Sequence, residues 1–451
     1  MIRAGNRFRW AAALMLALAG LVLPGCKKKV KHDLVIVSPH DKQIEAEFNR
    51  AFRAWHEEKF GKSVRIDWRD VGGTTSVTRF LLNQYASADG SGIDLYFGGG
   101  APDHKLLAAR GILQRVDLPE ELLSKLPEAI GGVRQYDPEH RWFGAAVSCF
   151  GIIYNARLLK ERNLPLPKRW EDLASPSMYR LVSAADGSQS GSARVAYEMI
   201  IQSAPDWPSG WAKLLKIYGN CKRFTGGASD VVNDVANGEV LAGAAIDFYA
   251  YKTIVVRGQD IGFSVVPGTT AYTPDPISLL KGAPNPETAK RFIEFVLSER
   301  GQALWCLPAG APGGPAQHAL YRQPVRRDVY EKYKGKMLAP LSDPFVESGD
   351  FKLNQEALEI RVSRLLGPLM TAAAIDSRKQ LSEAWKVIMD AGQPGSLLAE
   401  FTSLPADLAT EAKALETAKK LTDEKQREMI TSAWQRFFRE KYERIISRAG
   451  R

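Results

Sequence analysis

The stretch LVIVSPHDKQIEAEFNRAFRAWHEEKFG, residues 34–61, predicts one strand followed directly by one helix. Its first five residues are mostly apolar and rich in β-branched side chains, which is typical of a buried strand. Asp41 then occupies a preferred helix N-cap position, and apolar residues recur at helical spacing as far as Gly61, which ends the pattern. A strand that leads at once into an amphipathic helix is the first half of a parallel βαβ unit.

The same alternation continues along the chain. Strands are predicted at 64–68, 94–97, 142–154, 180–185, 240–246 and 261–266, and helices after 72–76, near 106, after 190, and at 211–218, 230–236 and 287–297. Strands that alternate with helices indicate an α/β fold built on largely parallel sheets. Asp275, which stands between two prolines, is interpreted as a turn residue.

The N-terminal segment has the composition of a secretory signal. Three arginines precede an apolar run at residues 10–23, which is shorter than a membrane-spanning helix requires. The run ends in Leu-Pro-Gly-Cys, which resembles the lipobox of bacterial lipoproteins and implies acylation of Cys26. We therefore expect a signal peptide at 1–25, a basic tether at 26–32, and a periplasmic or otherwise extracytoplasmic protein anchored to a membrane by lipid.

Composition limits the classes of partner. The 451 residues carry a formal net charge of +10, but no basic cluster is interleaved with aromatic side chains, so nucleic acid is not an expected partner. The positive balance mildly favours an anionic ligand. Cys149, Cys221 and Cys306 remain beyond the lipid site. An oxidising compartment permits one disulfide among them, yet their spacing selects no pair.

Two segments resemble catalytic motifs without completing them. Residues 56–60, HEEKF, begin like the helix of a zinc protease, but Phe60 stands where the second histidine is required. Residues 187–191, GSQSG, have the glycine spacing of a nucleophile elbow, but Gln189 occupies the position of the nucleophile. We therefore do not expect an enzyme. A tethered hydrolase and a partner-binding sensor module are kept as alternatives of another class.

Four loops rich in glycine or hydroxyl residues each follow a predicted strand and precede a helix. They lie at residues 39–40, 72–76, 98–100 and 188–192. In open α/β sheets, ligands bind beyond the carboxyl ends of the strands, where helix N-termini present backbone N–H groups and the positive end of the helix dipole. Four such loops, in two blocks of the chain, indicate one cleft between two lobes.

Several segments, in order and at suitable spacing, resemble the iron-type solute-binding proteins of ABC importers, which have the type II periplasmic-binding-protein fold. The likeness is carried by LVIVSPH (34–40), DLYFGG (94–99), ARGIL (109–113), WFG (142–144), IYN (153–155), LP (164–165), WEDL (170–173), SGS (190–192), GEV (238–240), DFY (247–249), NP (285–286), FIEFVLS (292–298) and GQ (301–302). It extends over roughly residues 33–335, whereas the C-terminal third is weakly matched or not matched.

The resemblance implies a two-lobed α/β fold with a cleft between the lobes, here followed by a helical C-terminal extension. It implies a first lobe at 33–140 plus 270–345, a second lobe at 141–269, hinges near 143–144 and 266–267, and an extension at 346–451. Hinges of this kind let the lobes close on a ligand, and a transporter can sense the closed state. The helical pattern after residue 405 is interpreted as an appendage packed on the body, with a partner-docking helix as the alternative.

The predicted function is capture of a small solute and its delivery to the permease and ATPase subunits of an ABC importer. The candidate solute-binding residues are His40, Gly73, Thr74, Thr75, Gly99, Ser148, Ser190, Gly191, Ser192, Asp247 and Tyr249. Hydroxyl-rich helix N-termini favour a solute that carries a phosphate or phosphonate group. Asp247 is expected to hold an amine or hydroxyls of the same molecule, and Tyr249 to stack on it or hydrogen-bond to it.

Ferric iron as cargo is the alternative within the family. Iron-binding members typically use two adjacent tyrosines, and the corresponding pair here is Phe248-Tyr249. Phenylalanine cannot ligate a metal, and ferric iron requires several anionic oxygens, so His40, Tyr249 and Tyr251 form an incomplete set of ligands. No resident cofactor is expected. The sequence leaves the identity of the solute and the membrane leaflet open.

Overall fold

The computed structural model describes residues 33–266, 268–339, 341, 343–347 and 351–449. The predicted signal peptide, the basic tether and the lipid site at Cys26 lie outside these ranges and stay predictions. Among the described helices, none combines the length and the apolar content needed to cross a membrane.

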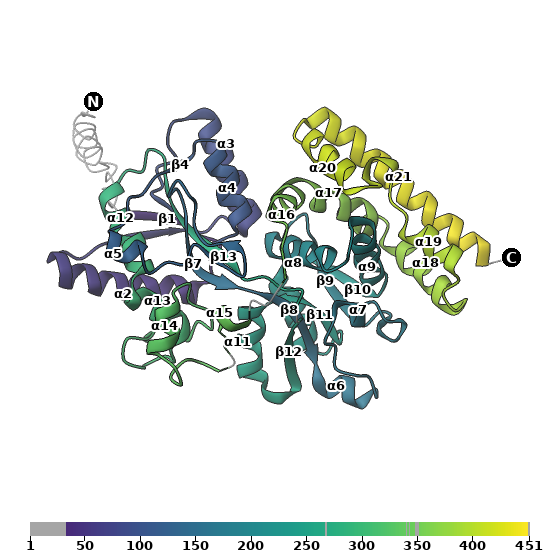
Figure 1. Ribbon diagram of the computed structural model, residues 1–451, viewed down its shortest axis with the longest axis horizontal. Coiled ribbons are helices and arrows are strands. Elements are labelled where there is room, and N and C mark those ends of the chain that lie inside the picture. Colours follow the sequence, from purple (N-terminus) through teal and green to yellow (C-terminus); the bar gives the residue numbers. More distant parts are fainter. Residues whose placement is uncertain (1–32, 267, 340, 342, 348–350, 450–451) are drawn as a thin grey trace, which may run out of the picture. The chain divides into compact units, whose positions relative to one another are not determined.

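The first sheet contains six strands and is mixed (Figure 1). Its strands are β1 (Leu34–Val37), β2 (Ile66–Arg69), β3 (Leu95–Phe97), β4 (Leu113–Gln114), β7 (Phe143–Ser148) and β13 (Thr273–Leu280). Strand β1 pairs in parallel with β2 and β3, as the alternation of strands and helices predicts, whereas β13 is antiparallel to β3, β4 and β7. We call this sheet and the helices packed on it the first lobe.

Helices cover both faces of the first sheet. They are α2 (Lys42–Phe60), α3 (Thr74–Ser87), α4 (Ala101–Ala109), α12 (Pro286–Leu297) and α13 (Glu299–Cys306), followed by the short α14 (Arg327–Lys332) and α15 (Pro344–Glu347). As predicted, Asp41 caps α2 by accepting hydrogen bonds from two backbone N–H groups, and Gly61 ends the helix at a φ of 66°. In the core beneath α2, Phe48 packs edge to face on Phe97, and Phe52 packs edge to face on Phe292.

The second sheet has five strands in the order β10-β9-β11-β8-β12. They are β8 (Phe150–Asn155), β9 (Val182–Ala185), β10 (Cys221–Thr225), β11 (Ala242–Ile246) and β12 (Ile261–Val265). The helices that accompany this sheet include α6 (Ala156–Glu161), α7 (Trp170–Leu173), α8 (Gly191–Gln202), α9 (Trp207–Gly219), α10 (Ala228–Ala236) and α11 (Asp247–Arg257). We call this sheet with its helices the second lobe.

The single strand predicted at 142–154 is wrong, because the structure has two strands there in different sheets. Strand β7 ends at Ser148 and pairs with β13, while β8 begins at Phe150 and pairs with β11 and β12. The chain therefore passes from the first sheet to the second at Cys149. Both strands are buried on both faces, so their residues form one continuous apolar run in which periodicity marks no break.

The interpretation of Asp275 as a turn residue is also wrong. Asp275 lies within β13, a strand that three other strands of the first sheet flank. Prolines normally exclude a segment from the interior of a sheet because they lack the N–H donor. Here the pairing of β13 with β7 shifts register between Asp275 and Pro276, and the carbonyl of Pro276 accepts from Gly98 N at 2.8 Å.

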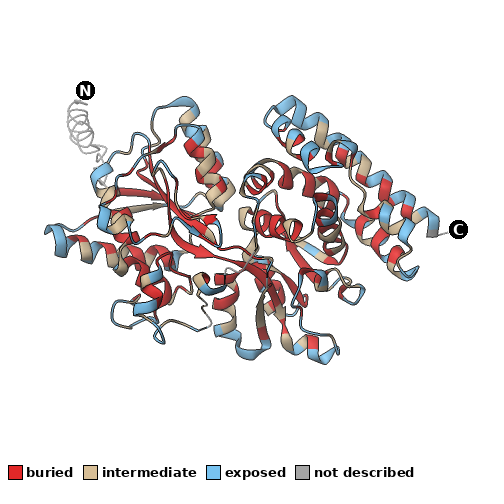
Figure 2. Cartoon of the chain, viewed as in Figure 1, coloured by how far each residue is buried: buried red, intermediate tan, exposed pale blue. Residues whose placement is uncertain are grey.

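The C-terminal extension is helical, as predicted. It contains α16 (Gln355–Ile360), α17 (Leu366–Met370), α18 (Arg378–Asp390), α19 (Gly395–Thr402), α20 (Glu411–Lys420) and α21 (Glu424–Ala449), with π-helical turns at Arg361–Leu365 and Thr371–Ile375. Its buried residues Trp385, Phe401 and Tyr442 belong to the same hydrophobic cluster as Trp211 of α9. Figure 2 shows α20 and α21 exposed along one side and buried along the other. The extension therefore shares its core with the second lobe.

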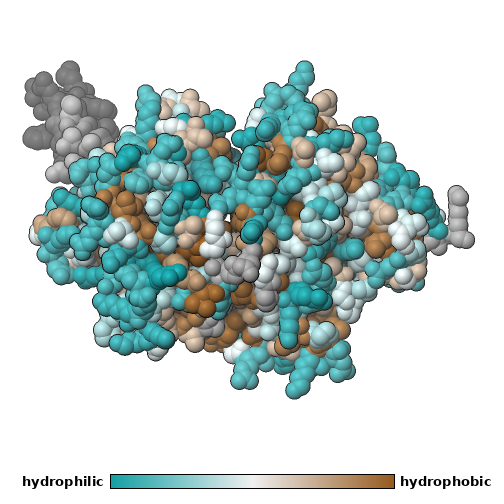
Figure 3. All heavy atoms as spheres, viewed as in Figure 1, coloured by the Kyte–Doolittle hydropathy of each residue, from teal (hydrophilic) through white to brown (hydrophobic). Residues whose placement is uncertain are grey.

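Cys149, Cys221 and Cys306 are buried free thiols, so none of the described cysteines forms a disulfide. They fit the interpretation of small buried side chains. On the surface, Figure 3 shows hydrophilic residues over much of the face in view, with apolar residues in separate patches.

Candidate functional site

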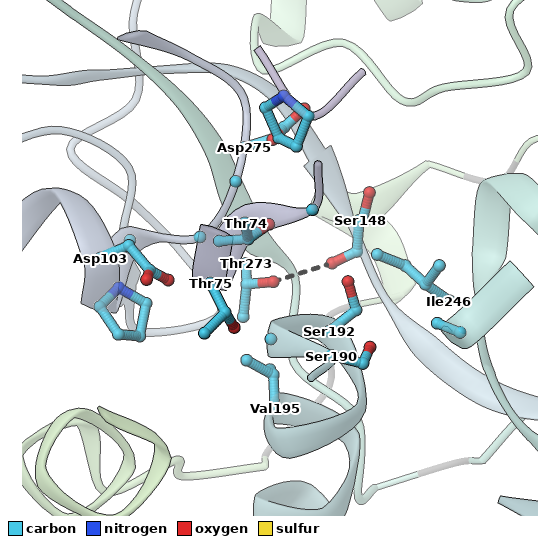
Figure 4. Close-up of a pocket in the computed structure, with 18 of the residues that line it drawn as sticks. Thr74, Thr75, Asp103, Ser148, Ser190, Ser192, Val195, Ile246, Thr273 and Asp275 are labelled. Carbon is cyan, nitrogen blue, oxygen red and sulfur yellow. Dashed lines mark hydrogen bonds between the residues drawn. The ribbon is translucent and has the colours of Figure 1, made fainter. Parts of the chain in front are cut away.

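A cavity of about 550 Å³ lies between the two lobes, a volume within the range of small-molecule sites. Ten of the predicted binding residues line it: His40, Gly73, Thr74, Thr75, Gly99, Ser148, Ser190, Gly191, Ser192 and Tyr249. Figure 4 shows that the side chains of Thr74, Thr75, Ser190 and Ser192 come to this cavity from α3 and α8. We call these four residues the hydroxyl cluster. The structure thus brings together loops that lie in separate blocks of the sequence.

Helices α3, α4, α8 and α10 are among those that begin at the wall of the cavity. Gly73, Gly100 and Gly227 are the N-caps of α3, α4 and α10, and none of these caps has a side chain that accepts a hydrogen bond from the first helical turn. At α8, Ser190 does cap the helix, because its hydroxyl accepts from Ala193 N at 3.3 Å. The first turn of a helix carries N–H groups without intrahelical partners and the positive end of the dipole. The cavity wall therefore favours an anion.

The turn between β3 and α4 requires glycine. Gly98 and Gly99 have φ values of 103° and 91°, which other residues rarely adopt. A Cβ atom on Gly98 would lie 2.8 Å from Cε1 of the His40 ring. Gly98 therefore lets the backbone approach His40, and Gly99 lets it approach Tyr96, at the edge of the cavity.

Three buried side chains on the first lobe form a second group, which we call the charged cluster: His40, Asp275 and Arg322. His40 Nε2 lies 2.8 Å from Asp275 Oδ2 and 3.0 Å from Arg322 Nη1, and Arg322 Nη1 also donates to Asp275. A single Nε2 atom either donates to the carboxylate or accepts from the guanidinium, so the tautomer of His40 selects one of its two contacts. Only 3% of the Arg322 side chain is exposed.

The charges of this cluster compensate one another. Burial alone would raise the pKa of Asp275, but Arg322 and then His40 outweigh burial and hold the pKa below its ordinary value. The guanidinium carbon of Arg322 lies 4.1 Å from the ring centre of Phe248 and 5.4 Å from that of Trp305. Its Nε atom has no hydrogen-bond partner among the described residues. Arg322 is therefore a fixed, desolvated cation on the wall of the cavity.

Sequence reasoning missed Arg322 and the role of Asp275. Arg322 lies in an irregular segment between α13 and α14, where neither periodicity nor a motif marks it. Arg322 is 282 residues from its partner His40 in the sequence, and His40 is 235 residues from Asp275. The other charged residues on the cavity wall that were not predicted are Asp41, Arg79, Asp103, Lys105, Arg134 and Glu359.

Asp247 lies behind the cavity wall and is not among the residues that line it. Its carboxylate accepts from the backbone N–H of Cys149 at 3.0 Å and from the side-chain amide of Gln323 at 3.1 Å. Burial raises the pKa of Asp247 to about 6, although the Cys149 N–H and the charge of Arg322 act in the opposite direction. Asp247 therefore supports the segment at Cys149 where the chain passes from the first sheet to the second, and we do not assign it a contact with the solute.

The alternative iron ligands do not converge. Tyr249 lines the cavity, but Tyr251 does not, and its ring packs edge to face on Phe263 at 5.5 Å. Burial raises the pKa of the Tyr249 hydroxyl, which opposes the tyrosinate that ferric iron requires. Within the described ranges, no group of three or more His, Cys, Asp or Glu side chains is arranged to hold a metal ion.

Several contacts join the lobes across the cavity. Arg194 Nη2 of α8 donates to Thr75 Oγ1 of α3 at 3.3 Å, and Lys252 Nζ of α11 donates to the carboxylate of Asp41 at 2.6 Å. Arg194 also lowers the pKa of Asp103, although burial outweighs it and the pKa lies above its ordinary value. Because these contacts join the two lobes, the cleft is closed in this structure, and a solute in it would touch both lobes.

Comparison with known proteins agrees with this architecture. A family described as "Bacterial extracellular solute-binding protein" matches residues 54–329. The phosphoglycerate transport regulatory protein PgtC of Salmonella typhimurium is 27% identical over 271 residues, which is 54% of this chain and 66% of that protein. This chain therefore spans just under two thirds of that relative. Iron uptake protein A1 of Synechocystis is 24% identical over 287 residues, 61% of this chain and 69% of that protein.

Solved structures share the fold at low identity. The periplasmic binding protein AfuA from Actinobacillus pleuropneumoniae, with fructose-6-phosphate bound, superposes with a TM-score of 0.58 at 19% identity, over 78% of this chain and 97% of AfuA. Iron-bound HitA from Pseudomonas aeruginosa gives a TM-score of 0.53 at 19% identity, over 73% of this chain and 98% of HitA.

Proposed function

We propose, since this chain belongs to the family of bacterial extracellular solute-binding proteins, that its cleft captures a small solute bearing a phosphate or phosphonate group. Members of this family bind a solute outside the cytoplasm and deliver it to the permease of an ABC importer; they are not enzymes. The observation that carries the proposed ligand class is the convergence of the N-termini of α3, α4, α8 and α10 on one cavity, three of which begin at a glycine that has no capping side chain.

The two clusters have complementary roles in this proposal. The hydroxyl cluster and the N-termini of α3 and α8 receive the anionic group, because hydroxyls and backbone N–H groups donate to its oxygens from both lobes. The charged cluster faces the remainder of the molecule. There Arg322 supplies a positive charge that water screens little, since the side chain is buried.

Two relatives support this ligand class by their names. PgtC is named for phosphoglycerate transport, and AfuA was solved with fructose-6-phosphate. Both compounds carry a phosphate group on a hydroxylated carbon skeleton. A molecule of this kind offers an anion to the hydroxyl cluster and hydrogen-bonding groups to the charged cluster.

The test is isothermal titration of the full chain with 3-phosphoglycerate, fructose 6-phosphate, inorganic phosphate and ferric citrate. We expect an organic phosphate to bind with one-to-one stoichiometry and to be recovered chemically unchanged. Saturable binding of ferric citrate alone, with a tyrosinate absorption band, would overturn the proposal. Native mass spectrometry of protein purified without chelators gives an independent reading of the cargo.

Ferric iron remains the second candidate, because Iron uptake protein A1 and iron-bound HitA are also similar to this chain. Two features weigh against it. Phe248 replaces one tyrosine of the typical pair, and the Arg322 guanidinium lies 4.1 Å from the Phe248 ring centre. Asp275 pairs with Arg322 and offsets part of its repulsion of a trivalent metal ion, so the missing tyrosine is the stronger of the two features.

We also propose that Cys26 is lipidated and tethers the protein to a membrane, as the sequence at residues 23–26 predicts. The test is metabolic labelling with radioactive palmitate in a bacterial host. Label is expected in the wild-type chain and not in Cys26→Ser. Equal labelling of both chains would contradict a lipid anchor at this residue.

The lobe boundary predicted at residue 141 and the hinge predicted near 143–144 move to Cys149, because β7 pairs in the first sheet. We otherwise keep the proposed division into lobes, with closure about the segments that join the sheets. Strand pairing makes Cys149 one such segment, and residues 266–272 make the other, with residue 267 outside the described ranges. The carboxylate of Asp247 accepts from the Cys149 N–H, so the first of these segments is anchored to the start of α11.

A further inference from the structure

The C-terminal extension reaches the cavity. Gln355, Leu358 and Glu359, all on α16, line the cavity together with residues of both lobes. These residues lie beyond 329, where the match to the solute-binding family ends. The wall that they form therefore lies outside the segment that the family model matches.

Helix α16 is held firmly on the second lobe. At its C-terminal end, Arg361 Nε donates to Glu198 of α8 at 2.9 Å, and both side chains are at most 2% exposed. At its N-terminal end, Asn354 N donates to Gln202 Oε1 at 2.7 Å. A buried, multiply hydrogen-bonded ion pair resists separation, because either charge alone would be left uncompensated. Helix α16 therefore moves with α8.

Helix α17, which lies beyond α16 in the chain, packs against the loop that leads to Ser190 of the hydroxyl cluster. Gly187 N lies 3.0 Å from the sulfur of Met370 in α17. A Cβ atom on Gly367 would lie 3.4 Å from the carbonyl oxygen of Gly187 and 3.5 Å from Cα of Ser188. The extension thus packs directly behind the Ser188–Ser190 segment.

One contact connects α16 to the first lobe, and a second connects it to the β5–β6 hairpin. Lys105 Nζ of α4 lies 3.0 Å from Glu359 Oε2, and Gln355 Nε2 donates to the carbonyl of Gly132 at 2.5 Å. Gly132 belongs to the turn between β5 (Ala129–Ile130) and β6 (Val133–Arg134), whose Val133 and Arg134 also line the cavity. Val133 of this hairpin belongs to the hydrophobic cluster of the second lobe and the extension, so the Lys105–Glu359 pair is the contact of α16 that crosses between the lobes.

We propose that α16 is an interlobe clasp of the solute site: Glu359 travels with the second lobe and holds Lys105 of the first lobe when the cleft is closed. The clasp limits the cavity on this side, so a closed complex admits only solutes that leave α16 in contact with the first lobe. This inference rests on the proposed function in one respect only, namely that closure follows binding of a solute in this cleft.

The first test is zero-length crosslinking of the full chain with a carbodiimide, which joins an amine to a carboxylate only when they are in contact. We expect an amide link between Lys105 and Glu359, with a yield that rises when fructose 6-phosphate or 3-phosphoglycerate is added. Lys420 and Glu416 are the internal control, because they pair at 2.7 Å within α20 and their link is expected not to respond.

The second test is a double-mutant cycle on the dissociation constant of fructose 6-phosphate, measured with Lys105→Gln, Glu359→Gln and both together. Each single change also alters the charge near the cavity, and the cycle cancels that effect. The pair is partly exposed, with 28% and 41% of the two side chains accessible, so we expect a coupling of about two- to fivefold. Glu416→Gln is the matched control and should leave the dissociation constant unchanged.

The outcomes separate this inference from the proposed function. Absence of the Lys105–Glu359 link under all conditions, or a link that forms while the cycle shows no coupling, would overturn the clasp. A link that forms while no phosphate-bearing probe binds would support the clasp contact and overturn the proposed ligand class instead.

Discussion

The hydroxyl cluster and the charged cluster line the same cavity but are built in opposite ways. Thr74, Thr75, Ser190 and Ser192 stand at helix N-termini, where each contributes one uncharged donor and the backbone contributes the rest. His40, Asp275 and Arg322 are full or potential charges in a buried group whose members depend on one another. Substitutions in the hydroxyl cluster should therefore weaken solute binding while the protein stays folded. Substitutions in the charged cluster should lower the free energy of unfolding first.

The largest expected effect is on the charged cluster. Arg322→Met removes the principal cation beside Asp275 and leaves this buried carboxylate with His40 as its remaining partner in the cluster. We expect the free energy of unfolding, measured with urea, to fall by about 3–5 kcal/mol. The double variant Arg322→Met with Asp275→Asn is the control and should recover much of that loss. A loss below about 1 kcal/mol in the single variant would contradict the dependence of these charges on each other.

Asp247 lies behind the same wall, and its raised pKa predicts that stability depends on pH. Its pKa is raised from 3.8 to about 6 in the folded protein, so the folded state binds the proton more tightly than the unfolded state. Stability should therefore fall as the pH rises from about 4 to 6, by about 3 kcal/mol in total. Asp247→Asn should remove this dependence. The measurement is the free energy of urea unfolding of the wild type and of Asp247→Asn at pH 4, 5, 6 and 7. If the two proteins show the same dependence on pH, the prediction is wrong.

Ser190 tests the hydroxyl cluster, where stability and binding are expected to separate. Ser190→Ala removes the N-cap of α8, which should lower the free energy of unfolding by about 1 kcal/mol and also weaken binding of fructose 6-phosphate. Ser192→Ala is the matched comparison, since this hydroxyl lies in the same turn but is not the N-cap. It should weaken binding with little change in stability. Equal stability loss in both variants would contradict the distinction.

The smallest expected effect is at Thr74. Thr74→Val keeps the shape of the side chain at the start of α3 and removes one hydroxyl donor. We expect affinity for fructose 6-phosphate to fall by about 0.5–1.5 kcal/mol, the net contribution of one hydrogen bond, with the free energy of unfolding unchanged. Calorimetric titration measures the first quantity and urea unfolding the second. Unaltered affinity would remove Thr74 from the contact set.

Much of the fold and of the hydroxyl cluster could be predicted from the sequence, because the signals are local. The N-cap at Asp41, the stop at Gly61 and the alternation of strands with helices each depend on residues within one or two turns of each other. The loops at 72–76 and 188–192 were found in the same way, since glycine and hydroxyl residues that follow a strand mark a helix N-terminus. Ten of the eleven predicted binding residues line the cavity.

The errors occur where long-range pairing overrides the local pattern. Prolines on both sides of Asp275 are a turn signal, yet β13 accepts them because the neighbouring strands pair with a register shift. The break at Cys149 has no local mark, because the residues before and after it are equally buried and apolar. In both places the partner strands, which lie far away in the sequence, determine the outcome.

By itself, then, the sequence determined the α/β class, the order of most of the elements, the family resemblance and the hydroxyl-bearing helix starts, because capping and periodicity act over a few residues. Only the tertiary structure decided that Arg322 joins His40 and Asp275, that Asp247 lies behind the wall, and that α16 completes the cavity. The physical reason is that a buried charge is tolerated only beside its partner, and packing of the whole chain decides which partner that is.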